Sequence, residues 1–568
     1  MKSIHINTKR ESNSFFFRII LYIVIILILT SLSIILSVFL KKDFTFRNIN
    51  EVYSYLEGSS VEFIIPFKQY ELSFENNIDQ ETRTAIIDSL RVMSNGEKER
   101  FSFVENSEYK VGLEYLKDNS DNLGYTYLVF VGHPYWITDG IKDSELSKYK
   151  FVVNKEQSKT IKPILTSYIN ADIEIIENDN IPTFLEKNEG KYIGVIEFDD
   201  LNDKLKLLEL NSKYFLDDIS GGIKVSYTLS DNIPDHIVNA AYKNSNINLE
   251  LDKSKLLKIN MTGVTAISRR LGVATQKSGS NSYAADKIYK FLSNADLVHT
   301  SNEVSFAENC IPNPATMRFC AVPSHIETLK KLGVNIVELT GNHNNDFGSS
   351  NNTSTIETYK KLGWDYYGGG LNSTDAAKPL IKDIKGSKVA FLGYNYYDTM
   401  LGTGALASSK NAGANSFSNE KMKKDIESIR KDVDTIIITF QFQECYSYPE
   451  HGGIYPICYK PLSSPDQKKV FRTAIDYGAD IVIGSQAHQP QTFEVYKDKM
   501  IYYGLGNLLF DQTPWIGTRQ GIILSHYVYK GKVLQTKITT TYYDDDLKPY
   551  VTTGTQRELL LKLLRDAR

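Results

Sequence analysis

The sequence predicts an α/β protein of more than one domain that follows a single apolar N-terminal segment. A chain of 568 residues is longer than one hydrophobic core normally supports, so two or three domains are expected. Short β-rich runs alternate with segments of helical periodicity, and consecutive strands follow near the C-terminus. This order is typical of layered sheets with helices on the outside.

Bulk composition gives little information about partners. The chain is 42% hydrophobic and 23% charged, with a formal net charge of −3. Such a balance gives no overall attraction to nucleic acid or to an acidic surface. No nucleic-acid partner is therefore expected, and any other partner has to be argued from local sites.

The apolar segment at residues 19–40 predicts a transmembrane helix. It contains no charged residue and is long enough to cross a hydrocarbon core of about 30 Å. A cleaved signal peptide would have a shorter apolar core and a small-x-small cleavage site, which residues 37–42 do not offer. We expect a cytoplasmic tail at residues 1–18 and a single-pass membrane anchor at residues 19–40.

The cysteines indicate on which side of the membrane the part of the chain after the anchor lies. Basic residues flank the apolar segment on both sides, which is a weak positive-inside signal. The 4 cysteines form two close pairs, Cys310 with Cys320 and Cys445 with Cys458, and these spacings favour two local disulfides. Disulfides suit an oxidising exterior, so we expect the body outside the cytoplasm. Four free buried thiols in a cytosolic protein remain the alternative.

Residues 43–250 predict a smaller α/β domain. They contain no cysteine and alternate strand and helix signals. The expected strands are residues 125–131, 151–154, 173–176 and 192–196, and the expected helix is residues 158–168. The run from Gly194 to Leu201 loosely resembles periplasmic-binding-protein-like domains, which implies a solute site; an α/β domain without a ligand is the alternative.

Residues 256–545 predict a larger α/β domain, followed by a C-terminal helical tail at residues 546–568. Each expected helix separates two expected strands until the final run of strands. The expected strands are residues 257–261, 297–299, 334–339, 388–393, 435–440, 480–483, 492–496, 500–503, 521–529 and 533–541. The expected helices are residues 282–292, 324–332, 355–362, 421–431 and 467–477.

Polar side chains gather where the strands of this larger domain end. In open α/β sheets, ligands bind at the carboxyl ends of the strands. Four of the loops that follow expected strands hold amide, imidazole and carboxylate groups that could converge there. These groups belong to Asn302, Glu303, Asn342, His343, Asp346, Gln441, Glu444, Gln486 and His488.

The same loops carry a resemblance to the CapA family of capsule-synthesis proteins. The motifs are Asn302-Glu303, the run from Gly341 to Gly348, the run from Gly484 to His488, and residues 501–510, in the family's order. The resemblance implies a layered α/β/β/α metallophosphoesterase-like sandwich. It also implies a role in capsule or poly-γ-glutamate biosynthesis, export or retention. Its implied partners are an anionic polymer such as poly-γ-glutamate and other capsule-synthesis membrane proteins.

Three departures from the family pattern reduce the number of metal ligands in the site that the resemblance implies. Val264 stands where the family has Asp, and Gln441 and Gln486 stand where it usually has His. Amide oxygens are poor ligands for transition metals. The remaining ligand candidates are Glu303, Asp346, Glu444 and His488, a set sufficient for one divalent ion (Mn, Zn or Mg) and thin for a pair.

Whether the chain is catalytic stays open at this point. In the favoured hypothesis a polar cleft binds polymer without cutting it: Gln441 and Gln486 pair with amides, and Arg269 and Arg270 pair with carboxylates. In the second, the protein is a metal-dependent phosphoesterase or amide hydrolase, with His343 and Asn342 as catalytic residues. In the third, residues 43–250 bind a solute and the protein is a surface receptor.

Overall fold

The computed structural model describes residues 68–74, 78, 80–93, 99–107, 109–114, 123–229, 247–248, 251–443 and 465–568. The predicted anchor at residues 19–40, Glu444, and the Cys445 and Cys458 pair lie outside these residues. Among the described residues, no helix has both the length and the apolar character needed to cross a membrane. The chain divides into two compact units.

The first unit comprises Met1–Tyr127, Lys155–Asn170 and Lys224–Glu250, and its described part contains a small sheet with two helices. Its strand order is β2 (Glu99–Phe103), β1 (Lys68–Phe74), β3 (Tyr109–Glu114) and β11 (Ile223–Leu229). The helices are α3 (Gln80–Met93) and α4 (Ser158–Ile169). Helix α4 buries Ile161, Ile164 and Leu165, a helical spacing, and stops where Asn170 adopts φ 52°. The helix expected at residues 158–168 is confirmed.

The second unit comprises Leu128–Asn154, Ala171–Ile223 and Leu251–Arg568. Its first two segments contribute strands in the order β7 (Ile175–Asn178), β6 (Lys150–Asn154), β8 (Tyr192–Glu197) and β4 (Gly124–Gly132). Strands β4, β6 and β8 coincide with expected strands, and β7 overlaps the C-terminal half of the strand expected at residues 173–176. The smaller elements here are β5 (Gly140–Ile141), β9 (Lys206–Leu207), β10 (Glu209–Leu210) and α5 (Ile181–Lys187).

Residues 251–568 of the second unit form two larger sheets. The first has the order β17-β16-β15-β13-β27-β28-β29, with β14 pairing β15 and β26. Its strands are β13 (Leu256–Thr262), β14 (Val264–Thr265), β15 (Leu297–Asn302), β16 (Ile336–Glu338), β17 (Asp365–Tyr367), β26 (Asn507–Leu509), β27 (Gln520–Tyr529), β28 (Lys532–Tyr543) and β29 (Pro549–Val551). Strands β13, β15, β16 and β17 run parallel.

The second large sheet has the order β19-β20-β22-β23-β25-β24, and its central strands β20, β22, β23 and β25 run parallel. Its strands are β19 (Leu380–Ile384), β20 (Ser387–Asn395), β22 (Thr435–Gln441), β23 (Ile481–Ser485), β24 (Pro490–Tyr496) and β25 (Lys499–Leu505). A separate pair joins β18 (Gly369–Gly370) to β21 (Gly413–Ala414).

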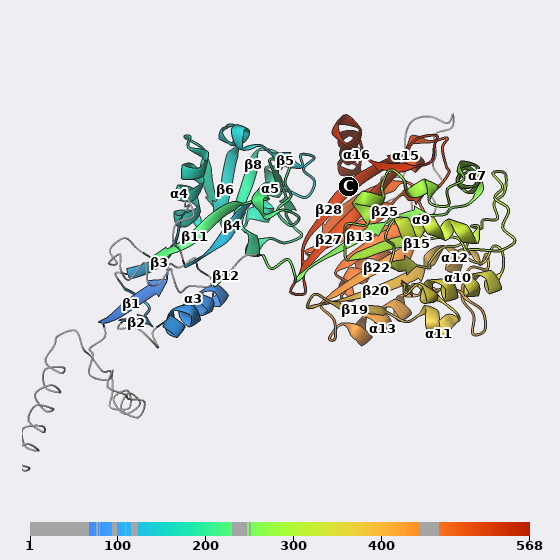
Figure 1. Ribbon diagram of the computed structural model, residues 1–568, viewed down its shortest axis with the longest axis horizontal. Helices are drawn as coiled ribbons and strands as arrows, with labels where there is room; N and C mark the ends of the chain where they lie inside the picture. Colours follow the sequence, from blue (N-terminus) through green and yellow to red (C-terminus); the bar gives the residue numbers. More distant parts are fainter. Residues whose placement is uncertain are drawn as a thin grey trace, which may run out of the picture. The chain divides into compact units, whose positions relative to one another are not determined.

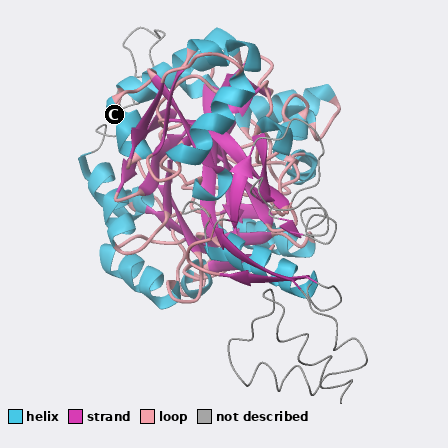
Figure 2. Cartoon of the chain, turned by 90° about the vertical axis from the view of Figure 1, so that its left-hand side faces the viewer, coloured by secondary structure: helices cyan, strands magenta, loops and turns pink. Residues whose placement is uncertain are grey.

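Three hydrophobic clusters separate four layers in this part of the unit. One cluster joins inward side chains of both sheets, among them Ile259, Phe391 and Ile437. The other two lie on the outer sheet faces and contain helical side chains such as Ile356 and Phe471. Strands therefore run through the middle, with helices outside them (Figures 1 and 2). The α/β class is confirmed.

The helices of these outer layers are short. They are α7 (Arg269–Ser278), α8 (Tyr289–Leu292), α9 (Ile326–Lys331), α10 (Ser349–Lys361), α11 (Ser373–Ala376), α12 (Tyr396–Leu401), α13 (Asn419–Ile429), α14 (Pro465–Asp476), α15 (Ile516–Arg519) and α16 (Gly554–Asp566). The helix expected at residues 282–292 is wrong in extent, because only a 3-10 turn (Tyr283–Ala285) and α8 form there. Helix α7 was not expected.

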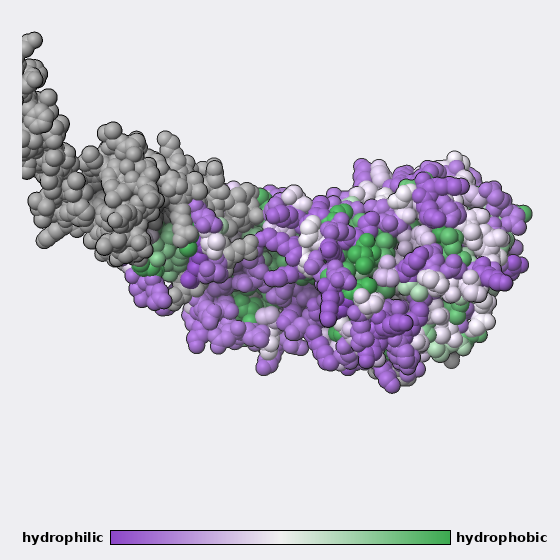
Figure 3. Space-filling model, turned by 90° about the horizontal axis from the view of Figure 1, so that it is seen from below, coloured by the Kyte–Doolittle hydropathy of each residue, from purple (hydrophilic) through white to green (hydrophobic). Residues whose placement is uncertain are grey.

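The surface of the described chain exposes few large hydrophobic side chains. The face in Figure 3 is mostly hydrophilic with local hydrophobic patches. The exposed large hydrophobics include Ile311 and Met317, in the loop after β15, and Met400 and Leu401, at the end of α12 after β20. These loops follow the carboxyl ends of parallel strands, where the candidate site lies.

Candidate functional site

Parallel strands of both large sheets bring the expected site loops together. Glu303 directly follows β15 of the first sheet, and Gln441 ends β22 of the second. The Gln441 Nε2 atom lies 3.2 Å from Glu303 Oε1 and 3.0 Å from Asn342 Oδ1. It also contacts Gln486 Oε1, from the loop after β23. Four loops far apart in the sequence therefore meet at one amide group.

The Gln441 amide is the centre of this arrangement. Its nitrogen, which has two hydrogens to donate, lies within reach of the side-chain oxygens of Glu303, Asn342 and Gln486, and its Oε1 accepts a 2.7 Å hydrogen bond from Ser485 Oγ. The polar groups that sequence reasoning assigned to a cleft are thus largely bound to one another. We call Glu303, Asn342, Gln441, Ser485 and Gln486 the amide cluster.

Most of the amide cluster is buried. Glu303 and Gln441 are each 1% exposed, and Gln486 is fully buried. Glu303 Oε2 is buried and accepts no hydrogen bond. A buried carboxylate oxygen without a donor costs free energy, so it indicates a site where a further group can bind. Gln486 adopts φ 84°, a strained conformation that is typical of functional loops.

His343 and Asp346 form a more accessible pair beside the amide cluster. His343 Nδ1 lies 2.6 Å from Asp346 Oδ2, and the two side chains are 16% and 18% exposed. A carboxylate on one ring nitrogen fixes the orientation of the imidazole. Asp346 was predicted as a metal ligand, and its observed contacts favour a role in orienting His343.

The backbone around Gly341 explains how this pair reaches the amide cluster. A Cβ atom at Gly341 would lie 2.6 Å from Glu303 Cα, so only glycine allows the loop to lie on the β15 end. Asn344 then closes the turn, because its Nδ2 donates to the carbonyl oxygens of Leu339 and Gly341 at 3.1 Å and 3.0 Å. The turn places Asn342 and His343 at the strand end.

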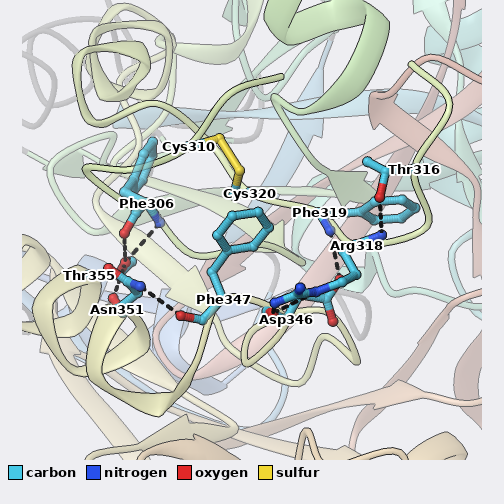
Figure 4. Close-up of a disulfide and its surroundings, with 10 residues drawn as sticks. All are labelled: Phe306, Cys310, Thr316, Arg318, Phe319, Cys320, Asp346, Phe347, Asn351 and Thr355. Carbon is cyan, nitrogen blue, oxygen red and sulfur yellow. Dashed lines mark hydrogen bonds between the residues drawn. A yellow bond between two sulfur atoms is a disulfide. The ribbon is translucent and has the colours of Figure 1, made fainter. Parts of the chain in front are cut away.

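The loop after Glu303 supports the His343–Asp346 pair. Phe319 N donates to Asp346 Oδ2 at 2.7 Å, and the Phe319 ring lies 3.9 Å from the His343 ring centroid. Arg318 donates to the Asp346 carbonyl oxygen at 2.6 Å and 3.2 Å. Cys320, next along the chain, forms the expected disulfide with Cys310 (Figure 4). The sequence analysis did not single out Phe319 or Arg318.

Arg269, expected to pair with carboxylates of a polymer, pairs with a carboxylate of the chain itself. It is the first residue of α7, with φ 45°, and its guanidinium is held by the Asp511 carboxylate. The same guanidinium lies 4.6 Å and 5.3 Å from the ring centroids of Phe319 and Phe510. Arg269 is thus engaged in packing beside the site. The exposed Arg270 donates to Thr513 Oγ1 at 2.6 Å.

His488 and Val264 lie in the supporting layer of the site. His488 Nδ1 lies 2.9 Å from Asn507 Oδ1, and its ring centroid lies 4.7 Å from that of Phe510. Val264, where the family pattern has an acidic residue, is 1% exposed and belongs to a hydrophobic cluster. Asn302 binds Val304 O and Tyr359 Oη at 2.6 Å and 2.8 Å, which is a structural role.

The donor set tests whether a metal ion fits this site. Within the described residues, no group of three or more His, Cys, Asp or Glu side chains is arranged to hold a metal ion. The atoms around the Gln441 amide are oxygens, with Glu303 as the carboxylate. Oxygen donors suit a hard cation such as Mg²⁺ or Mn²⁺. Glu303, Asn342 and Gln486 are the side chains that would hold one.

The comparisons with known proteins match the part of the chain that contains the candidate site. Residues 258–512 match the family model described as "Bacterial capsule synthesis protein PGA_cap". Through these residues the chain is a member of the CapA family. The "Capsule biosynthesis protein CapA" of Bacillus anthracis is 25% identical over 284 residues, which cover 49% of this chain and 65% of the relative. The "PGA biosynthesis protein CapA" of Bacillus subtilis (strain 168) is 22% identical, covering 50% and 71%.

Solved structures give weaker similarities. An NAD nucleotidase of Haemophilus influenzae aligns with 55% of this chain and 63% of its own length, at 10% identity and a TM-score of 0.30. An ABC-type phosphate transport receptor from Vibrio cholerae aligns with 31% of this chain and 94% of its own, at 11% identity and a TM-score of 0.23. Scores this low carry no conclusion about this CapA family member.

Proposed function

We propose that this CapA family member acts at the cell surface in the biosynthesis, export or retention of a capsule polymer such as poly-γ-glutamate. The observation that carries the proposal lies within the family-matched residues 258–512. There, the accessible His343–Asp346 pair sits beside the buried amide cluster. A polymer of amide bonds and carboxylates offers the donors and acceptors that such a site can bind.

The proposed location is outside the cytoplasm, on a single-pass anchor formed by residues 19–40. Two observations support it: the uncharged apolar run in the sequence and the Cys310–Cys320 disulfide beside the site. An anchored protein of this kind would work with other capsule-synthesis membrane proteins. The polymer contacts would come from Asn342, His343 and Arg318, which are not fully buried.

Surface polymer in cells that depend on this chain tests the proposal. We expect His343→Ala to lower the amount of surface polymer while the protein level stays unchanged. Ile311→Ser is the matched control, because Ile311 is 83% exposed in a neighbouring loop and supports no site residue. Unchanged polymer in the His343→Ala cells, at equal protein level, would refute the assignment of this site.

A second candidate function is a metal-dependent phosphoesterase or amide hydrolase. The specific observation in its favour is the orphan Oε2 of Glu303 near a carboxylate-oriented imidazole. One divalent ion, Mg²⁺ or Mn²⁺ on this oxygen donor set, would supply Lewis-acid chemistry at Glu303, and His343 would move a proton at the leaving group.

Metal analysis and hydrolysis assays separate this candidate from the first. The purified full chain is assayed on a generic phosphodiester and on poly-γ-glutamate. Stoichiometric metal that is lost in Glu303→Gln, together with hydrolysis that is lost in His343→Ala, would establish the hydrolase. Polymer binding without turnover, with or without added Mg²⁺ or Mn²⁺, would leave only the binding function.

A further inference from the structure

We infer that the Cys310–Cys320 disulfide holds the His343–Asp346 pair in place, so that the candidate site is assembled when this bond is oxidised and loosens when it is reduced. The inference rests on the proposed function, because it names a regulation of the same site. The geometry that carries it is independent of the reaction or ligand. It involves three consecutive residues, Arg318, Phe319 and Cys320.

Arg318 and Phe319 contact the pair, and Cys320 follows them directly along the backbone; Figure 4 shows the contacts with Asp346. Phe319 N donates to the Asp346 carboxylate at 2.7 Å, which is a hydrogen bond to a charged acceptor. The Phe319 ring packs on the imidazole that Asp346 orients, with ring centroids 3.9 Å apart and ring planes tilted by 32°. Arg318 holds the Asp346 carbonyl oxygen at 2.6 Å and 3.2 Å. The path of this backbone therefore fixes both members of the pair.

The disulfide is one of the restraints on that path, beside the hydrogen bonds that join Ala321 to Ser305 and Ala307. The bond spans a sequence separation of 10 and its cysteines are 8% and 4% exposed. The loop between them contributes little apolar burial, since Ile311 and Met317 are 83% and 71% exposed. In the chain-entropy model, closing this loop stabilises the folded state by restricting the unfolded chain. Within the loop, Pro312 and Phe319 are buried, so they are the other points at which the loop is held.

Other contacts hold the Phe319 ring and limit the expected effect. Arg269 lies 4.6 Å from the ring centroid, and Phe510 packs on the ring edge at 6.2 Å. These contacts do not depend on the bond. Opening the disulfide should therefore leave the sheets folded and release chiefly the Phe319 N–H and the Arg318 guanidinium from Asp346.

The chemical step is a thiol–disulfide exchange. A dithiol reductant gives two electrons and two protons to the Cys310–Cys320 bond and itself becomes a disulfide, and two thiols form on the chain. Cys310 and Cys320 are largely buried, so the exchange follows a local opening of the loop. Outside the cytoplasm the oxidised form is the resting state.

Hydrogen exchange and NMR on the full chain test the inference. In Cys310→Ser/Cys320→Ser we expect the Phe319 amide to exchange at least about tenfold faster than in the wild type, because its bond to the carboxylate is lost. We also expect the imidazole ¹⁵N resonances of His343 to shift. Ile311→Ser, in the same loop, should change neither. Neither readout needs polymer or turnover, so failure of the proposed function does not affect the result.

Reduction of the wild-type protein is the second measurement. A dithiol is added, and alkylation with mass spectrometry shows which cysteines have opened. Cys445→Ser/Cys458→Ser separates the effect of the other cysteine pair. Unchanged Phe319 exchange and His343 resonances in the reduced protein would overturn the inference. Global unfolding on reduction would overturn it too, because the bond would then hold the fold rather than the site.

Discussion

The ion pair between Arg269 and Asp511 gives the sharpest stability prediction, through the substitution Asp511→Asn. The two side chains are 13% and 4% exposed. Asp511 also accepts a 2.9 Å hydrogen bond from Arg270 N at the start of α7. Asparagine keeps the shape but leaves the Arg269 charge uncompensated against Phe319 and Phe510. Breaking a buried pair in this way costs about 3–5 kcal/mol, and the slight exposure of Arg269 favours the lower end.

A double-mutant cycle with Arg269→Met separates the coupling energy of the ion pair from the other effects of each substitution. Each single variant should be destabilised by about 3 kcal/mol, and the double variant by much less than the sum, with a coupling of about 2–3 kcal/mol. Native-state hydrogen exchange of the α7 amides measures this locally, without assuming that the two units unfold together. Additive effects, with a coupling below about 0.5 kcal/mol, would refute the reasoning.

Three further predictions follow from other parts of the second unit. Burial, with His299 adding to it, lowers the pKa of His526 from 6.5 to about 3, so the unfolded chain binds more protons than the folded chain between these values. Stability present above pH 6.5 should be lost as pH falls, by up to about 1.4 kcal/mol per pH unit, and His526→Gln should flatten this loss in pH-dependent denaturation. Gly341→Ala should displace the 342–346 loop and weaken ligand binding more than Gly363→Ala does. A Cβ at Gly341 would lie 2.6 Å from Glu303 Cα, whereas at Gly363 nothing lies within 4 Å. Equal effects of the two substitutions in a binding assay would contradict this prediction. Gln441→Leu should cost at least about 2 kcal/mol in denaturant unfolding, because buried oxygens of Glu303 and Gln486 lose their donor, and a neutral result would show that the amide cluster is not formed.

The sequence located most strands of the sandwich because they are β-branched or aromatic runs with clear ends. The expected strand at residues 435–440 is β22 (Thr435–Gln441), and the one at residues 521–529 is β27 (Gln520–Tyr529). Some of the strands it missed are short and pair with distant partners, such as β14 (Val264–Thr265). Helix α7 was missed because its two leading arginines and Gly272 obscure the apolar spacing.

Part of the candidate site was predictable in its membership, but its bonding was not. Parallel strands place their carboxyl ends together, which brings Glu303, Asn342, Gln441 and Gln486 into one place. Their burial was not predictable, since it depends on one sheet lying against the other. The partnerships of Arg269 with Asp511 and of Phe319 with Asp346 join residues far apart in the sequence. No local pattern indicates such pairs.

The Cys310–Cys320 disulfide was predictable from the sequence, but its relation to the site was not. Close spacing favoured the Cys310–Cys320 bond, and the structure contains it. Its relation to the site came only from the three-dimensional path of residues 318–320, which carries the bond to the His343–Asp346 pair. The second predicted bond, between Cys445 and Cys458, stays a prediction.

Equilibrium binding of poly-γ-glutamate oligomers to the detergent-solubilised full chain tests the central claim most directly. The claim is that the strand-end site around His343 and the amide cluster holds the capsule polymer. We predict saturable binding that weakens at least about tenfold, or about 1.4 kcal/mol, in His343→Ala and in Asn342→Ala, and that is unchanged in Ile311→Ser. Binding that is absent in the wild type, or that persists unchanged in both site variants, would contradict the account.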